Sequence, residues 1–118
     1  MFQTAIEKFK FTNHFISFIP KAVFFDMDGV LFDSMPFHAR AWTNTMIDIG
    51  VKFTEYEAYL NEGRTGNSTI DEAFNRDFGR DATEEEKQAI YRRKSVYFES
   101  YGKSTVMPFA YDLLQKVK

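Results

Sequence analysis

The segment VFFDMDGVLFDS, which spans Val23 to Ser34, sets the interpretation of the rest of the chain. Its apolar beginning, Ala22–Phe25, predicts a short strand without polar alternation, as in the buried strands of parallel sheets. Asp26 and Asp28 follow directly. Because residues i and i+2 of an extended chain point the same way, we expect both carboxylates on one side of the strand's carboxyl end. In open α/β sheets, ligands bind at that end.

Two carboxylates this close repel each other, so one of them would stay protonated unless its charge were offset. A divalent cation such as Mg²⁺ removes the conflict, because one carboxylate binds the metal while the other handles protons. Gly29 permits a sharp turn away from the strand and lets a ligand approach the backbone. A carboxylate nucleophile beside a hard cation suits phosphoryl transfer through an aspartyl-phosphate.

Other interpretations of the DxDG pattern lead elsewhere. An EF-hand loop starting at Asp26 needs Gly at its sixth position and Glu at its twelfth, and Leu31 and Phe37 stand there instead. On the two aspartates alone, a glycosyltransferase-type DxD with a metal and a nucleotide sugar stays open, as does a plain polar turn. Asp33 is interpreted, with Ser34, as shaping the turn into the next helix, because both residue types are favoured at helix N-caps.

The composition is that of a globular protein. The 118 residues are 44% hydrophobic and 27% charged, enough for one domain or part of a larger one. The net charge of −2 gives no electrostatic reason to expect nucleic acid or an anionic membrane as a partner. The absence of cysteine excludes a disulfide scaffold and is compatible with a reducing cytoplasm, which is the expected location. No apolar run reaches the roughly 18 residues of a membrane span.

The remainder of the chain is helical in pattern. Residues 1–20 allow either a short amphipathic helix packed on the main body or a loose extension, since Phe15 and Phe18 do not continue the spacing of the first turns. The single strand has no partner in this sequence, so most of its sheet is expected outside it. Capping residues, glycine stops and apolar spacing predict five later helices, over about 35–49, 54–63, 69–78, 84–101 and 109–118.

The string FDMDGVLFDS, followed by His38 and by Ala41-Trp42, closely resembles the first motif of the haloacid dehalogenase-like hydrolases, in their β-phosphoglucomutase-like branch with a helical cap. The resemblance covers about residues 21–118. It implies an α/β protein with a Rossmann-like core, of which only the first strand is present here, and a mostly helical chain. The implied domains are an N-terminal extension (1–20), a partial core (21–34 and 102–118) and an inserted helical-bundle cap (35–101).

The resemblance also implies an activity. Asp26 would be the nucleophile and a Mg²⁺ ligand, and Asp28 the general acid/base that gives its backbone carbonyl to the metal. The implied protein is a Mg²⁺-dependent phosphohydrolase that acts on a small, phosphosugar-like phosphorylated metabolite, and a monomer when complete. A β-phosphoglucomutase-type phosphosugar mutase and a non-catalytic fragment that bears a cap remain alternatives.

The loop EGRTGNS, Glu62 to Ser68, falls at the family's cap specificity loop. The mutases carry an arginine three places after the loop glycine, where this chain has Gly66. Arg64 follows Gly63 directly and, with Thr65, is a candidate for substrate binding through the bidentate geometry of its guanidinium. An exposed loop arginine is the equal alternative. This departure favours a phosphatase over a mutase.

Two further candidates lie on expected cap helices. His38, near the hinge, either helps to position Asp28 or is a packed hinge histidine. Lys94 falls where some mutases keep a lysine for the distal phosphate. Because Arg92 and Arg93 stand beside it, a solvated basic face is the favoured interpretation.

Three later motifs of the family, a Ser/Thr, a Lys and an acidic pair, come after the cap and are not found in these 118 residues. We therefore expect the chain to correspond to the N-terminal half of such an enzyme. By itself it should be inactive, because Asp26 and the Asp28 carbonyl supply only two of the roughly six oxygen ligands that Mg²⁺ prefers.

Overall fold

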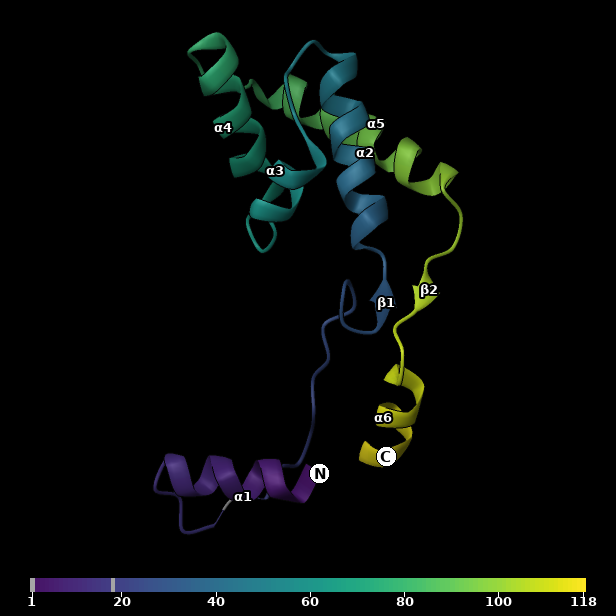
Figure 1. The fold of residues 1–118 in the computed structure, drawn as a ribbon. Helices are drawn as coiled ribbons and strands as arrows, with labels where there is room; N and C mark the ends of the chain where they lie inside the picture. Colours follow the sequence, from purple (N-terminus) through teal and green to yellow (C-terminus); the bar gives the residue numbers. More distant parts are fainter. Residues whose placement is uncertain (1, 18) are drawn as a thin grey trace.

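The structure, a computed structural model, describes residues 2–17 and 19–118. Met1 and Phe18, the latter part of the ambiguous N-terminal pattern, lie outside the described residues. Figure 1 shows a group of helices at one end of the molecule, further helices at the other end and short strands between them. The elements are α1 (Phe2–Thr12), β1 (Phe32–Asp33), α2 (Met35–Asp48), α3 (Glu55–Leu60), α4 (Gly66–Phe78), α5 (Glu84–Ser100), β2 (Thr105–Val106) and α6 (Ala110–Val117).

The helices α2 to α5, with their connecting loops, form one bundle, here called the cap. Met46 on α2 and Ile70 on α4 are completely buried, and Trp42 packs against the same cluster. All four helices contribute to a single hydrophobic core, so the cap has a complete core of its own. The core residues are Ala39, Met46, Val51, Phe53, Ala58, Ile70, Ala73, Phe74, Ala82 and Ile90.

Local capping sets where the cap helices begin. Thr54 and Glu57 form a capping box at the start of α3, as their spacing predicts: the Glu57 amide donates to Thr54 Oγ1 at 3.1 Å, and the Thr54 amide donates to the Glu57 carboxylate at 2.8 Å. The predicted box of Thr83 and Glu86 is also present, at the start of α5. Helix α4 starts three residues earlier than predicted, because Thr65 acts as its N-cap.

The prediction of a strand over Ala22–Phe25 is wrong for this structure. The segment is extended but unpaired among the described residues, and the Phe24 side chain is 95% exposed. The physical reason is the one that the sequence already raised: a strand needs neighbours for its N–H and C=O groups, and none is present.

The strands that do form are β1 and β2, which the sequence pattern did not predict. They pair antiparallel, with Phe32 opposite Val106 and Asp33 opposite Thr105. As Figure 1 shows, β1 lies where the chain enters the cap and β2 lies where the chain leaves it. Two-residue strands are too short to leave a recognisable periodicity, which explains why they were missed.

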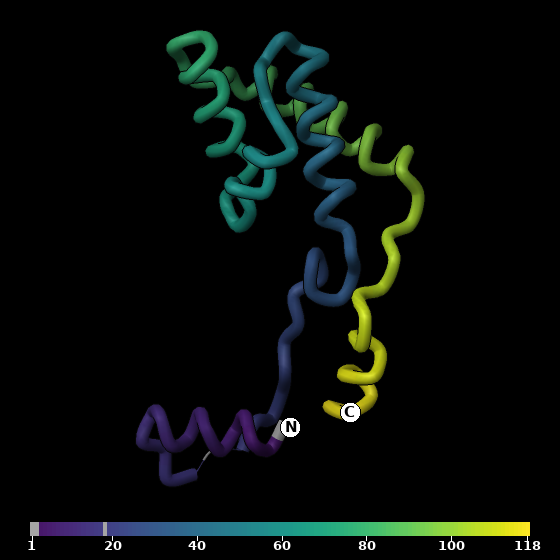
Figure 2. The backbone as a smooth tube through the Cα atoms, in the orientation of Figure 1, coloured from purple at the N-terminus to yellow at the C-terminus, as the bar shows by residue number. Residues whose placement is uncertain are grey.

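The N-terminal helix α1 forms but does not pack on the cap. In Figure 2 an extended stretch of backbone separates it from the bundle. The radius of gyration is 19.2 Å, against roughly 13 Å for a compact chain of this length. The described chain is thus an elongated molecule with one compact part, the cap. No helix within residues 2–17 and 19–118 is both long and apolar enough to cross a bilayer.

Candidate active site

The two aspartates lie in a tight turn between the extended segment and the cap. The amides of Leu31 and Phe32 both donate to the Met27 carbonyl at 3.0 Å, and the Gly29 amide donates to the Phe32 carbonyl at 2.8 Å. Gly29 has a φ of +72°, and a Cβ there would lie 3.1 Å from Met35 Cγ. The positive φ and the close contact both favour glycine at this position, as the sequence predicts.

Asp28 is held by two neighbours. The Ser34 hydroxyl donates to Asp28 Oδ1 at 2.6 Å, and His38 Nε2 lies 3.4 Å from the same oxygen. The Ser34 bond is the main reason that the pKa of Asp28 lies below its usual value, with a further lowering from His38. The prediction that Ser34 caps α2 with its side chain is wrong. Its backbone is in the right-handed helical region (φ −98°, ψ −15°) and not in the extended region typical of capping residues, and its side chain makes no cap hydrogen bond.

Asp26 is exposed, and its Oδ1 accepts a hydrogen bond from the Met27 amide at 2.8 Å. Both aspartates line one cavity of about 320 Å³ beneath the cap. The predicted pair is thus brought to one site, but in two settings: the Asp26 carboxylate is open to a ligand and the Asp28 carboxylate is engaged. Asp33 instead lies exposed in β1, with its backbone paired to Thr105.

His38 and Lys94 extend the contacts of Asp28 into the cap. Lys94 Nζ lies 2.8 Å from His38 Nδ1, and the His38 ring stacks on Phe98 with 4.2 Å between centroids. An ammonium can only donate, so Nδ1 accepts and the Nε2 proton faces Asp28. Burial, together with the Lys94 ammonium, lowers the pKa of His38. His38 is therefore a packed histidine that is also in contact with Asp28, so the two interpretations of this residue do not exclude each other.

The interpretation of Lys94 as part of a solvated basic face is wrong. Its side chain is partly buried, with the ammonium 5.2 Å from the Phe98 ring centroid and 5.7 Å from that of Trp42. Burial lowers the pKa of Lys94. Arg92 and Arg93 are exposed, as that interpretation requires. The three neighbouring cations differ in burial because they lie on different faces of α5.

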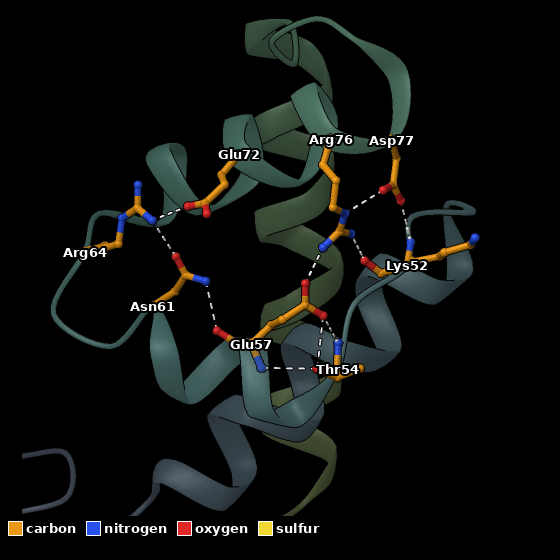
Figure 3. Close-up of polar contacts among 8 residues, drawn as sticks. All are labelled: Lys52, Thr54, Glu57, Asn61, Arg64, Glu72, Arg76 and Asp77. Atoms are coloured by element: carbon orange, nitrogen blue, oxygen red, sulfur yellow. Dashed lines mark hydrogen bonds and ion pairs between the residues drawn. The ribbon is translucent and has the colours of Figure 1, made fainter.

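The loop between α3 and α4 closes the cavity from the cap side. Arg64 lines the cavity, whereas Thr65 uses its hydroxyl to cap α4 by accepting from the Ser68 amide at 3.3 Å. A Cβ at Gly66 would overlap the Tyr91 hydroxyl, so no larger residue fits there while Tyr91 keeps its position. Figure 3 shows Arg64 turned toward Asn61 and Glu72.

Comparison with known proteins places this site in a family. Residues 20–118 match the family model described as haloacid dehalogenase-like hydrolase. The chain belongs to this family. A solved structure described as "Putative beta-phosphoglucomutase from Bacteroides vulgatus" matches with a TM-score of 0.85 and 47% sequence identity, over 98% of this chain and 48% of that one. The chain therefore spans about half the length of that relative. A search of the curated proteins finds no match.

Membership of the haloacid dehalogenase-like hydrolases confirms the predicted family and fold class, a partial Rossmann-like core with a helical cap. The two aspartates were proposed as site residues from the sequence. The engagement of Asp28 by Ser34, and of Lys94 by His38, was not. A signal for the second contact is present in retrospect: Phe98 lies one helical turn after Lys94 on α5, and both side chains contact His38.

The donor chemistry at the turn suits a hard cation. The Asp26 carboxylate and the Asp28 backbone carbonyl are oxygen donors of the kind that Mg²⁺ prefers. Across the part of the chain that the structure describes, no group of three or more His, Cys, Asp or Glu side chains is arranged to hold a metal ion. These residues fit part of a Mg²⁺ site.

Proposed function

We propose that the full-length protein is a Mg²⁺-dependent phosphohydrolase that acts on a small, phosphosugar-like phosphorylated metabolite through an aspartyl-phosphate at Asp26. The observation that carries the proposal is the contrast between the two carboxylates in one cavity. Asp26 is open to attack a phosphoryl group, whereas Asp28 is fixed by Ser34 and His38 as a proton-handling group should be.

In the first step, the free oxygen of the Asp26 carboxylate attacks phosphorus while the bond to the leaving oxygen breaks. The Met27 amide holds Oδ1 and so orients Oδ2 as the attacking atom. The leaving oxygen takes a proton from the Asp28 carboxyl group. Mg²⁺, bound by the Asp26 carboxylate and the Asp28 carbonyl, would offset the negative charge of the phosphoryl group.

In the second step, water attacks the phosphorus of the aspartyl-phosphate and gives its proton to the Asp28 carboxylate. Inorganic phosphate leaves and Asp26 is regenerated. The Ser34 hydroxyl and His38 hold the Asp28 carboxylate in place. Because both contacts lower the pKa of Asp28, they orient this group and do not strengthen it as a base. Lys94 acts through His38, because its ammonium fixes the tautomer that presents Nε2–H to Asp28.

A phosphosugar mutase is the second candidate. The similarity to the structure described as a putative beta-phosphoglucomutase from Bacteroides vulgatus, at 47% identity, favours it. Gly66 at the position where the mutases carry an arginine favours the phosphatase. The two activities differ in product: a phosphatase releases inorganic phosphate, and a mutase returns an isomeric sugar phosphate.

The full-length protein would be incubated with para-nitrophenyl phosphate and with hexose phosphates, in Mg²⁺ or in EDTA. We expect Mg²⁺-dependent release of inorganic phosphate, and a phosphorylated Asp26 that hydroxylamine traps and mass spectrometry identifies. Isomerisation without phosphate release would establish the mutase instead. Absence of both products, or phosphorylation at another residue, would overturn the proposal.

A further inference from the structure

Arg64 stands in the wall between two cavities. The catalytic cavity of about 320 Å³ lies on one side, and a second cavity of about 430 Å³, between α3 and α4, lies on the other. Asn61, Arg64 and Thr69 line both. Thr69 is on a helix and buried, whereas Arg64 is on the loop, with 47% of its side chain exposed. A long side chain at this position can serve either cavity.

The charges that line the catalytic cavity give Arg64 a specific importance. Asp26, Asp28 and Glu62 are acidic. Among the described lining residues, Arg64 is the one arginine or lysine, so its guanidinium is the one cation there that stays charged at every working pH. A ligand with a second anionic group, remote from the phosphoryl group that reacts, has this guanidinium to bind and three carboxylates to avoid.

In the structure the Arg64 guanidinium is bound by two other side chains, which limits its availability to a ligand. Its Nη1 donates to Asn61 Oδ1 at 2.9 Å and pairs with the Glu72 carboxylate, as Figure 3 shows. Asn61 is itself oriented, because its Nδ2 donates to the Glu57 carbonyl at 2.9 Å. Both contacts use Nη1, and no other guanidinium nitrogen of Arg64 has a hydrogen-bond partner among the described residues.

The pair with Glu72 can be opened at low cost. The side chains are 47% and 58% exposed, and ion pairs this exposed contribute little to stability because solvent screens them. A phosphate that meets the planar guanidinium makes two parallel charge-assisted bonds, which are stronger. An anionic ligand in the catalytic cavity therefore competes with Glu72 for Arg64.

We propose that Glu72 is a specificity-determining residue, an internal counter-ion that competes with the remote anionic group of the substrate for Arg64. The inference rests on the proposed function and narrows its substrate class to phosphorylated metabolites with a second anionic group, such as sugar bisphosphates. Glu72 lines the second cavity, outside the catalytic one, so it sets the availability of Arg64 without touching the reacting atoms.

The test compares Glu72→Gln with the wild type in the full-length protein, using fructose 1,6-bisphosphate and para-nitrophenyl phosphate as substrates. We expect KM for the bisphosphate to fall about two- to fivefold, the range set by removing one exposed ion pair, with kcat unchanged. Kinetics with para-nitrophenyl phosphate should not change. Glu85→Gln, the same charge change at an exposed position of α5, is the matched control and should leave both substrates unaffected.

Arg64→Ala supplies the second arm. It should raise KM for the bisphosphate about tenfold. In the Arg64→Ala background, Glu72→Gln should no longer lower KM for the bisphosphate. An equal effect on both substrates, a gain that survives in the Arg64→Ala background, or the same gain in Glu85→Gln would overturn the inference.

Failure of the proposed function gives a different result, because no variant would then hydrolyse para-nitrophenyl phosphate. Calorimetric binding of fructose 1,6-bisphosphate to wild type and to Glu72→Gln still decides the inference in that case. Tighter binding by the variant supports it, and equal or undetectable binding by both overturns it.

Discussion

The cap and the segments at its foot, residues 19–33 and 102–118, are both rich in apolar side chains, but the cap buries a cluster of them and the foot segments leave several exposed. In the cap, Met46 and Ile70 are fully buried in a core that four helices share. At the foot, Ile19 is 84% exposed, Phe24 95% and Phe109 81%. Hydrophobic residues alone do not make a fold, because each needs partner surfaces from neighbouring elements. The cap contains its partners and the foot segments do not.

The chemistry divides along the same boundary. Asp26 and Asp28 belong to the foot, whereas His38 and Lys94, which position Asp28, belong to helices of the cap. Ser34 lies between the two, at the junction of β1 and α2. The proposed catalytic groups therefore lie in the less self-contained region and are contacted by side chains of the more self-contained one.

The strongest test of this division removes the nucleophile at the foot. Asp26→Asn in the full-length protein should lower the rate of phosphate release by roughly four orders of magnitude or more, because an amide of nearly the same shape cannot form the acyl phosphate. Circular dichroism should show an unchanged fold. Asp33→Asn, a nearby exposed acid, is the control and should keep the activity. Wild-type turnover by Asp26→Asn would remove Asp26 from the mechanism.

The second test removes the proton-handling group. Asp28→Asn keeps an oxygen that can accept from Ser34 but cannot exchange a proton, so kcat should fall about 10²- to 10⁴-fold. The loss should be smaller than for Asp26→Asn, because the nucleophile remains. Steady-state kinetics with para-nitrophenyl phosphate measures both variants. A loss below tenfold would mean that another group transfers the proton.

The sequence was sufficient where a feature depends on near neighbours in the chain. A glycine turn at 29 and the two threonine capping boxes were predicted because each depends on residues a few positions apart. The common placement of Asp26 and Asp28 was predicted from an extended strand that does not form, although both residues line one cavity.

The sequence failed where a contact joins distant segments. The pairing of β1 with β2 connects residues more than 70 positions apart, and Lys94 meets His38 across 56 positions. The role of Ser34 was also not predicted: a hydroxyl before a helix usually caps it, and here it donates to an aspartate six residues earlier while its backbone is in the right-handed helical region. The foot segments were expected to depend on partners outside the sequence, and this stays a prediction.

The difference in packing between the two regions has a direct measure in stability. Ile70→Ala should destabilise the 118-residue chain by about 2–5 kcal/mol, since it removes a fully buried side chain and leaves a cavity. Phe24→Ala, which removes more atoms from a side chain that is 95% exposed, should change the free energy of unfolding by less than about 0.5 kcal/mol. Urea denaturation followed by circular dichroism compares the two. Similar effects would mean that the foot is packed in solution.

The smallest expected effect concerns a surface pair that supports the start of α5. Arg80 makes two hydrogen bonds to the Glu86 carboxylate, at 2.7 and 2.8 Å, and the Thr83 amide donates to the same group. Together they lower the pKa of Glu86 to about 2, from a usual 4.5. The unfolded chain therefore binds a proton at this group before the folded chain does, so the stabilisation is complete above about pH 4.5 and is lost as the pH falls toward 2.

Glu86→Gln isolates this contribution, because the amide oxygen still accepts from Thr83 but carries no charge for Arg80. We expect the variant to melt a little below the wild type at pH 7, and the difference to shrink as the pH is lowered from 4.5 to 2. The effect should be small, since both side chains are exposed to solvent. In an Arg80→Gln background the pH-dependent part of the difference should largely disappear. A difference in melting temperature that stays constant from pH 7 to pH 2 would show that the cap helix depends on the geometry of the capping box and not on the charge of Glu86.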